Sequence, residues 1–179
     1  KRAAEGLAQE SLQFLNRAPE KILVLVGTGN NGADALLAAL LSSTRKTKIT
    51  AVFTSSSATT PLAKKIWRLA QKKIYKVPVQ KLKSLSKINY CLIFDGLLGQ
   101  GFRAPLRPEM RNIILKSNLL KGLRIAVDLP SGIGDDSKGP SFKADLTISI
   151  GSLKRPLLES KNSAAVGRLR VIDIGLPLG

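Results

Sequence analysis

The segment KILVLVGTGNNGAD, residues 21–34, joins a continuous apolar run to a glycine-rich loop and the start of an Ala- and Leu-rich stretch. The run Lys21–Val26 is typical of a strand that is buried on both faces of a parallel sheet. The stretch Gly32–Leu41 predicts a helix behind it. Between them the glycines follow the spacing Gly-x-Gly-x-x-Gly, which allows a tight turn and the close approach of a ligand phosphate to helix N-terminal amides.

The rest of the chain repeats this alternation of apolar runs and helical patterns. Helices are expected over 3–16, near 61–73 and near 107–118, and strands at 48–54, 75–79, 90–94, 124–127, 146–150 and 169–174. Strands that are apolar throughout and alternate with helices indicate an α/β fold with a mostly parallel sheet covered on both faces. The length fits one domain over residues 1–179. No convincing helix separates the last two predicted strands.

The composition excludes several kinds of site. The chain has no His and one Cys, so a Ser-His-Asp triad, a His-ligated metal, a disulfide framework and a thiolate zinc site are all excluded. Sparse cysteine indicates a reducing compartment, and we expect a cytoplasmic protein. The apolar runs are too short to span a bilayer, so no membrane partner is expected.

The net charge is strongly positive and unevenly distributed. Lys and Arg number 29 against 12 Asp and Glu, which gives +17. No acidic residue lies between Asp34 and Asp95, whereas twelve cationic residues do. Such a stretch is typical of a solvated lysine-rich surface, and nucleic-acid binding is the alternative. We favour the solvated surface because no repeated aromatic spacing for base stacking and no nucleic-acid motif is present.

Three of the seven Asp residues lie in the segments that follow predicted central strands, namely Asp34, Asp95 and Asp128. In open α/β sheets ligands bind beyond the carboxyl ends of the strands, so this edge is the expected site. Without His, carboxylates and Lys are the main groups left for proton transfer. Asp128 is therefore a candidate general acid or base.

The same loops also bear on a metal site and on two other activities. The oxygen-bearing side chains of Asn31, Asp95 and Ser131 suit a hard cation of low charge, because one carboxylate is sparse for a divalent ion. An ordinary dehydrogenase is disfavoured, since the second strand ends in Phe53-Thr54-Ser55 without the acidic contact to ribose. The Gly-Lys-Ser/Thr of a P-loop is absent as well, which disfavours phosphoryl transfer.

Taken together and in order, these loops resemble the NAD(P)H-hydrate epimerase family, the YjeF N-terminal domain. The blocks that carry the resemblance are Gly27–Asp34, Asp95–Pro105, Asp128–Gly132, Lys143–Thr147, Gly151–Lys154 and Asp173–Pro177. The resemblance implies a three-layer αβα Rossmann-like fold, a homodimer and an isomerase of nicotinamide cofactor repair. Such an enzyme interconverts the R and S epimers of hydrated NADH and NADPH, so that an ADP- or ATP-dependent NAD(P)H-hydrate dehydratase, separate or fused, can restore the cofactor.

The resemblance also implies roles for particular residues. It implies that the substrate is lined by Asn30, Asn31, Gly32, Ala33 and Asp34, and along its phosphate side by Gly99, Gln100, Gly101, Phe102, Arg103, Ala104 and Pro105. It implies Asp128 beside the nicotinamide as the proton-transfer group. It implies a potassium ion held by Asn31, Asp95 and Ser131. Lys154 is a weaker candidate, as a phosphate or structural contact.

Two departures from the family pattern bear on activity. Ala33 and Ala35 replace glycines of the usual Asn-Asn-Gly-Gly-Asp-Gly loop, and Arg155-Pro156 replaces the usual Pro-Gly. A methyl group at Ala33 is harmless if its φ is helical, and it adds strain if φ is positive. The alternative function is that of a non-catalytic family member, which serves as an RNA-binding or scaffold domain.

Overall fold

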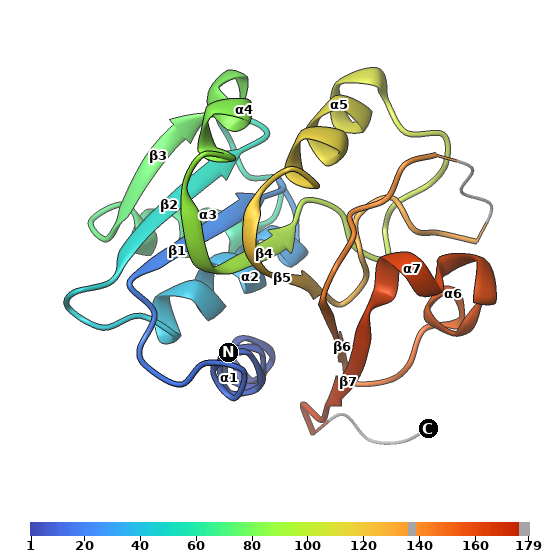
Figure 1. Ribbon diagram of the computed structural model, residues 1–179, viewed down its shortest axis with the longest axis horizontal. Coiled ribbons are helices and arrows are strands. Elements are labelled where there is room, and N and C mark those ends of the chain that lie inside the picture. Colours follow the sequence, from blue (N-terminus) through green and yellow to red (C-terminus); the bar gives the residue numbers. More distant parts are fainter. Residues whose placement is uncertain (136–138, 176–179) are drawn as a thin grey trace.

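Seven parallel strands form the middle layer of this computed structural model, which describes residues 1–135 and 139–175 (Figure 1). The strands are β1 (Lys21–Val26), β2 (Lys48–Phe53), β3 (Ile74–Pro78), β4 (Asn89–Gly96), β5 (Lys121–Val127), β6 (Leu146–Ile150) and β7 (Arg168–Ile172). They lie in the order β3-β2-β1-β4-β5-β6-β7, and each neighbouring pair is parallel. The chain therefore reverses its direction across the sheet between β1 and β4, where a crevice for ligands forms in such folds.

Helices cover both faces of the sheet. One layer holds α1 (Arg2–Leu12), α2 (Asn30–Leu41) and α3 (Pro61–Ala70), and the other holds α4 (Leu82–Leu85) and α5 (Pro108–Ser117) (Figure 1). Along β1, Ile22 and Val24 pack on the α1–α3 side, whereas Leu23 and Leu25 pack on the α4–α5 side. Two buried faces explain why this strand is apolar at every position after its first. The predicted three-layer α/β fold is confirmed.

The element bounds differ from the prediction in ways that have physical causes. Helix α2 begins two residues early, because Gly29 is extended at the N-cap and Asn30 already has helical geometry. Between β6 and β7 the chain forms only short pieces: α6 (Arg155–Leu158), the 3-10 turns of Ser160–Asn162, and α7 (Ser163–Val166). Each piece is too short to leave a helical period in the sequence. A further 3-10 turn, Val79–Lys81, precedes α4.

Two other predictions concern the C-terminal block of the resemblance and membrane-spanning segments. The C-terminal block of the resemblance includes Leu176 and Pro177, which lie outside the described residues. Within residues 1–135 and 139–175, no helix combines the length and the apolar character needed to cross a membrane.

Candidate active site

The N-terminus of α2 lies against the ends of β1 and β4 because glycines leave room for it. A Cβ atom on Gly32 would lie 2.2 Å from the carbonyl oxygen of Gly27, and one on Gly27 would lie 2.0 Å from the carbonyl oxygen of Leu97. Real side chains do not tolerate such distances. The glycine spacing thus serves close packing of backbone on backbone, and it opens the space above the two strands to a ligand.

The two asparagines that open α2 fasten it to different neighbours. Asn30 accepts a 2.6 Å hydrogen bond from the hydroxyl of Thr60, which itself caps α3 by accepting from the amide of Ala63. Asn31 donates from Nδ2 to the carbonyl oxygen of Leu98 at 2.7 Å. Both side chains are therefore held at the cavity wall by hydrogen bonds.

Asp95 and Ser131 form a buried polar pair beneath the cavity. The Asp95 carboxylate is 0% exposed and accepts from the Ser131 hydroxyl at 2.7 Å, the Ser131 amide at 2.8 Å and the Leu97 amide at 3.2 Å. Burial raises the pKa of Asp95 to about 6, although these hydrogen bonds oppose the shift. The Ser131 hydroxyl also accepts from the amide of Leu98 at 2.9 Å. The three predicted cation ligands therefore converge around the Leu98 segment.

Asp128 follows β5 in an unusual backbone conformation, with φ of 68°. Its amide donates to the carbonyl oxygen of Ile148 at 2.9 Å, and its Oδ1 accepts from the amide of Ile150 at 3.0 Å. Its Oδ2 accepts from Nε2 of Gln100 at 3.1 Å. The residue is 8% exposed, so the surrounding backbone fixes the carboxylate in one position at the cavity.

Lys154 is the charge partner of Asp128, a pairing that sequence spacing does not reveal. Its Nζ lies 2.5 Å from Oδ1 of Asp128, and it also donates to the carbonyl oxygen of Ile150 at 2.5 Å and to the hydroxyl of Ser149 at 3.2 Å. The side chains of the pair are 10% and 11% exposed. All three hydrogens of the ammonium group thus have acceptors, which makes Lys154 a fixed positive charge behind the carboxylate.

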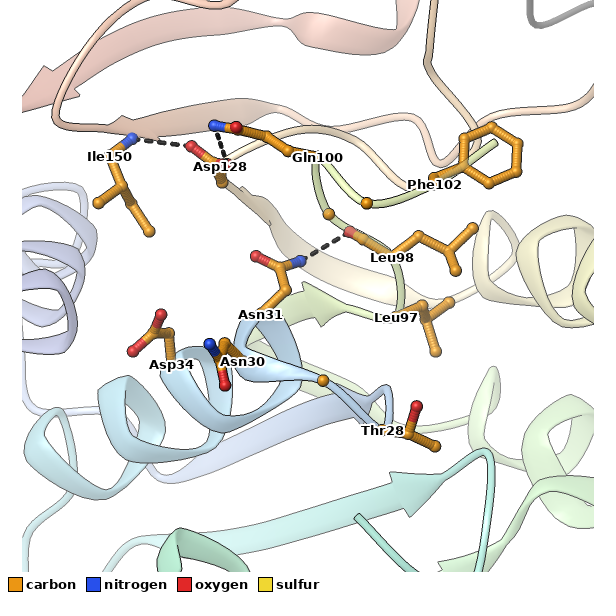
Figure 2. A pocket seen from close by; sticks show the side chains of 13 residues that line it. Thr28, Asn30, Asn31, Asp34, Leu97, Leu98, Gln100, Phe102, Asp128 and Ile150 are labelled. Carbon is orange, nitrogen blue, oxygen red and sulfur yellow. Dashed lines mark hydrogen bonds between the residues drawn. The ribbon is translucent and has the colours of Figure 1, made fainter. Parts of the chain in front are cut away.

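A cavity of about 610 Å³ opens over the carboxyl ends of β1, β4 and β5 (Figure 2). This volume lies in the usual range for small-molecule sites. The predicted substrate residues that line it are Asn30, Asn31, Asp34, Gly99, Gln100, Gly101, Phe102 and Asp128. Sequence reasoning missed Thr28, Gly29, Leu97, Leu98 and Ile150, which also line it. Thr28 and Gly29 could have been found, because they lie within the glycine loop.

The remaining predicted substrate residues lie elsewhere. Gly32 and Ala33 are buried and do not line the cavity. Arg103 and Lys154 line a neighbouring cavity of about 370 Å³, which shares Gly99, Gln100 and Phe102 with the first. Ala104 and Pro105 are joined by a cis peptide bond and line neither of these two cavities. The loop after β4 thus forms the boundary between two adjoining cavities.

Asp34 enters the main cavity from α2 and has a perturbed environment. Partial burial raises the pKa of its carboxyl, the amino group of Lys1 opposes the shift, and the negative charge of Asp128 adds to it. Across the described residues no group of three or more His, Cys, Asp or Glu side chains gathers around a possible metal position.

Comparison with known proteins places the chain in a family. The family model described as YjeF-related protein N-terminus matches residues 1–156. The chain belongs to this family. It is 34% identical to an NAD(P)H-hydrate epimerase of Clavibacter sepedonicus, over 98% of this chain and 81% of that protein. It is 30% identical to an NAD(P)H-hydrate epimerase of Elusimicrobium minutum, over 98% and 83%. The resemblance noted in the sequence is confirmed.

Other relatives are longer than this chain. A bifunctional NAD(P)H-hydrate repair enzyme of Hyperthermus butylicus is 28% identical over 98% of the chain, which spans only 34% of that protein. Among solved structures, the yeast protein Ynu0 (YNL200c) matches with a TM-score of 0.65 at 22% identity, covering 83% of this chain and 68% of the yeast chain. This structural match supports the fold.

The departures from the YjeF family loop are accommodated by the structure. Ala33 and Ala35 both lie within α2 at 0% exposure, and neither has a positive φ. Gly96 makes room for the second methyl group, because a Cβ there would lie 2.5 Å from Cβ of Ala35. A helical backbone makes alanine the more favourable residue, so these changes stiffen α2 rather than strain it.

Proposed function

We propose that this chain is an NAD(P)H-hydrate epimerase, an isomerase that interconverts the two epimers of hydrated NADH and NADPH. The observation that carries the proposal is Asp128, a carboxylate held at the cavity by Lys154, Gln100 and the amide of Ile150. The names of the relatives that match nearly the whole chain support the same activity.

The chemistry requires a group that moves a proton at one ring carbon. Hydration leaves a hydroxyl on the carbon bonded to the ring nitrogen, and inversion there needs a bond to be broken and remade. Asp128 is the proposed proton-transfer residue. The ammonium group of Lys154 compensates the negative charge of Asp128, because a carboxylate buried to this extent without a partner would be costly.

A potassium ion is the proposed cofactor, held by Asn31, Asp95 and Ser131. Asp95 is fully buried, and no described cationic side chain pairs with it. Its neighbours offer amide, hydroxyl and carbonyl oxygens, the ligand types that suit a hard monovalent ion. A bound cation would supply the positive charge that the Asp95 carboxylate lacks. It would also tie the start of α2 to the loops after β4 and β5.

The partner of the epimerase is proposed to be an ADP- or ATP-dependent NAD(P)H-hydrate dehydratase. Several relatives are bifunctional repair enzymes, of which this chain spans about one third. An epimerase alone leaves its substrate hydrated, so an enzyme that removes the water from one epimer must follow. A homodimer stays a prediction.

The test mixes both epimers of hydrated NADH with a dehydratase that accepts only one of them. The dehydratase alone should consume its own epimer rapidly and the other only at the rate of spontaneous epimerisation. Adding this protein should convert the slow phase into a fast one that runs to completion. An unchanged slow phase would contradict the proposal.

A further inference from the structure

Two titratable side chains line the main cavity, Asp34 and Asp128. Asp34 projects from α2, and Asp128 from the segment after β5, so the two carboxyl groups enter the cavity from different sides (Figure 2). They are close enough for the charge of Asp128 to act on Asp34. The two carboxyl groups therefore share one cavity but are supported by different elements.

The surroundings of the two carboxyl groups differ sharply. Asp128 has three hydrogen-bond or ion-pair donors, from Ile150, Gln100 and Lys154. The side chain of Asp34 has no hydrogen bond or ion pair to any residue that the structure describes. Donors around a carboxylate favour its ionised form, whereas partial burial without donors favours the protonated form. Such a difference between two carboxyl groups in one cavity separates a base from an acid.

Lys154 cannot readily take the acid role. Each of its three ammonium hydrogens already has an acceptor, in Asp128, Ile150 and Ser149. To reach a substrate it would have to break the ion pair that fixes Asp128. Among the described residues that line the cavity, Asp34 is thus the remaining carboxyl group that can act as the acid.

We propose that Asp34 is a second catalytic residue of this site, which exchanges a proton with the substrate on the side of the ring opposite Asp128. The inference rests on the proposed epimerase function and adds the pathway of inversion. Inversion by loss and re-addition of water requires departure of the hydroxyl from one face of the ring and attack of water on the other. A site with one proton-transfer group on each side provides for both.

In the proposed reaction the hydroxyl leaves as water from one face of the ring, and a second water adds to the other face. Protonated Asp34 gives its proton to the hydroxyl, the carbon–oxygen bond breaks, and the electron pair leaves with the departing water. The nitrogen lone pair forms a carbon–nitrogen double bond, which leaves a ring iminium ion. A water molecule on the other face then adds to the carbon, and the Asp128 carboxylate accepts its proton. One water leaves, one enters, and one proton passes from Asp34 to Asp128; proton exchange with bulk water then returns both groups to their starting states.

The experiment compares Asp34→Asn, Asp34→Glu and wild type in water enriched in oxygen-18, starting from a single epimer. Asn is nearly isosteric but cannot donate an acidic proton. We expect it to lower kcat about 10²- to 10⁴-fold with little change in KM. Glu should restore part of the loss. Wild-type product should carry one solvent oxygen for each inversion. Glu109→Gln, an exposed change on α5, is the matched control and should leave kcat unchanged.

The outcomes separate this inference from the proposed function. If wild type does not epimerise the substrate, the proposed function fails. If wild type is active but Asp34→Asn keeps a kcat within threefold of it, Asp34 is not catalytic and the proposed function stands. Inversion without uptake of solvent oxygen would overturn the water-exchange step. Thermal unfolding of each variant checks that a lost activity does not reflect a lost fold.

Discussion

Asp128 combines a strained backbone with a buried ion pair. A non-glycine residue at φ of 68° is uncommon, although Asp adopts this region more readily than most residues. Hydrogen bonds to Ile148 and Ile150 and the contact with Lys154 hold it there. Such strain is found where the surrounding structure fixes a residue for a function. The local geometry therefore supports a role in the reaction rather than in folding.

Replacing Asp128 with Asn keeps the shape and the tolerance for this backbone conformation, but it removes the charge. We expect epimerisation to be abolished while binding of the hydrated cofactor is largely retained. Chromatographic separation of the epimers measures turnover, and calorimetry in parallel measures binding of the hydrated cofactor. Unchanged turnover in Asp128→Asn would contradict the proposed proton-transfer role of Asp128.

Replacing Lys154 with Met removes one partner of a buried pair. Removal of one charge in such a pair typically costs about 3–5 kcal/mol, because the other is left uncompensated. We expect Lys154→Met to lose stability on this scale and to lose activity, and Asp128→Asn/Lys154→Met to recover part of the stability. Urea unfolding of the four proteins gives the coupling energy. A coupling energy near zero would mean that the two charges do not depend on each other.

The buried carboxyl of Asp95 predicts how stability depends on pH without potassium. Its pKa is raised from 3.8 to about 6, so the folded protein holds this proton more tightly than the unfolded chain does. The stabilisation from this group is complete below pH 4 and is lost as pH rises through 6. We expect stability to fall by roughly 3 kcal/mol over this range. Potassium at pH 8 should restore it.

Asp95→Asn is the variant that checks this account, because it cannot titrate. Its unfolding free energy should lack the fall between pH 4 and 7, and potassium should no longer raise it. Sodium at equal ionic strength is the salt control. A potassium response of the same size in Asp95→Asn and wild type would show that the ion binds elsewhere.

At the scale of elements, the position of α2 depends on the glycines beneath it. A Cβ on Gly32 would meet backbone of Gly27 at 2.2 Å, whereas one on Gly29 would meet no atom within 4 Å. Gly32→Ala should therefore be destabilised by about 1–3 kcal/mol or more, as overpacked sites are. Gly29→Ser is the matched change, and because Ser is a good N-cap residue it should leave stability nearly unchanged. Equal midpoints of thermal unfolding for the two variants would contradict the close approach of α2.

Elements were predictable from sequence where the local pattern was long. The runs at Lys21–Val26 and Leu146–Ile150 have the predicted bounds. The first is apolar at every position after Lys21, and the second is buried along its length although it contains Thr147 and Ser149. The pieces α6 and α7 were missed, since four residues carry no period. The pair of Asp128 and Lys154 was also beyond sequence reasoning, because its partners are 26 residues apart and meet only through β5 and β6 pairing.

The residues of the site were also predictable only in part. The strand-end loops and their carboxylates were predicted from the parallel sheet, and Asn30, Asn31, Asp34 and Asp128 all line the cavity. Ala33 does not, because its place on α2 turns its side chain into the core, and a helical face is not visible in a loop motif. Leu98 enters the site partly through its carbonyl oxygen, which the residue type does not reveal.

At the scale of the whole molecule, the basic stretch between Asp34 and Asp95 forms an exposed surface around one sheet edge. Its cations lie on the segment before β2 and at the start of β2, on α3, on and around β3, and around α4, so they surround the β3 edge of the sheet (Figure 1). All twelve cations are exposed, and none pairs with a described acidic residue. They are Arg45, Lys46, Lys48, Lys64, Lys65, Arg68, Lys72, Lys73, Lys76, Lys81, Lys83 and Lys87.

Mutual repulsion across this surface should destabilise the fold at low salt. Screening lengths shorten from about 30 Å at 0.01 M to about 8 Å at 0.15 M, so salt should raise the midpoint of thermal unfolding. A variant with Lys65, Lys72 and Lys76 changed to Glu should be more stable in low salt and show a weaker salt response. A gel-shift series against RNA tests the alternative use, for which binding should weaken steeply as salt rises.

The most direct test of the epimerase reaction follows one purified epimer of hydrated NADPH by chromatography, at a pH where spontaneous epimerisation takes far longer than the assay. Catalytic amounts of wild-type protein should bring the two epimers to their equilibrium ratio, and Asp128→Asn should leave the starting epimer unchanged. A single epimer that persists with folded wild-type protein and potassium present would contradict the central claim.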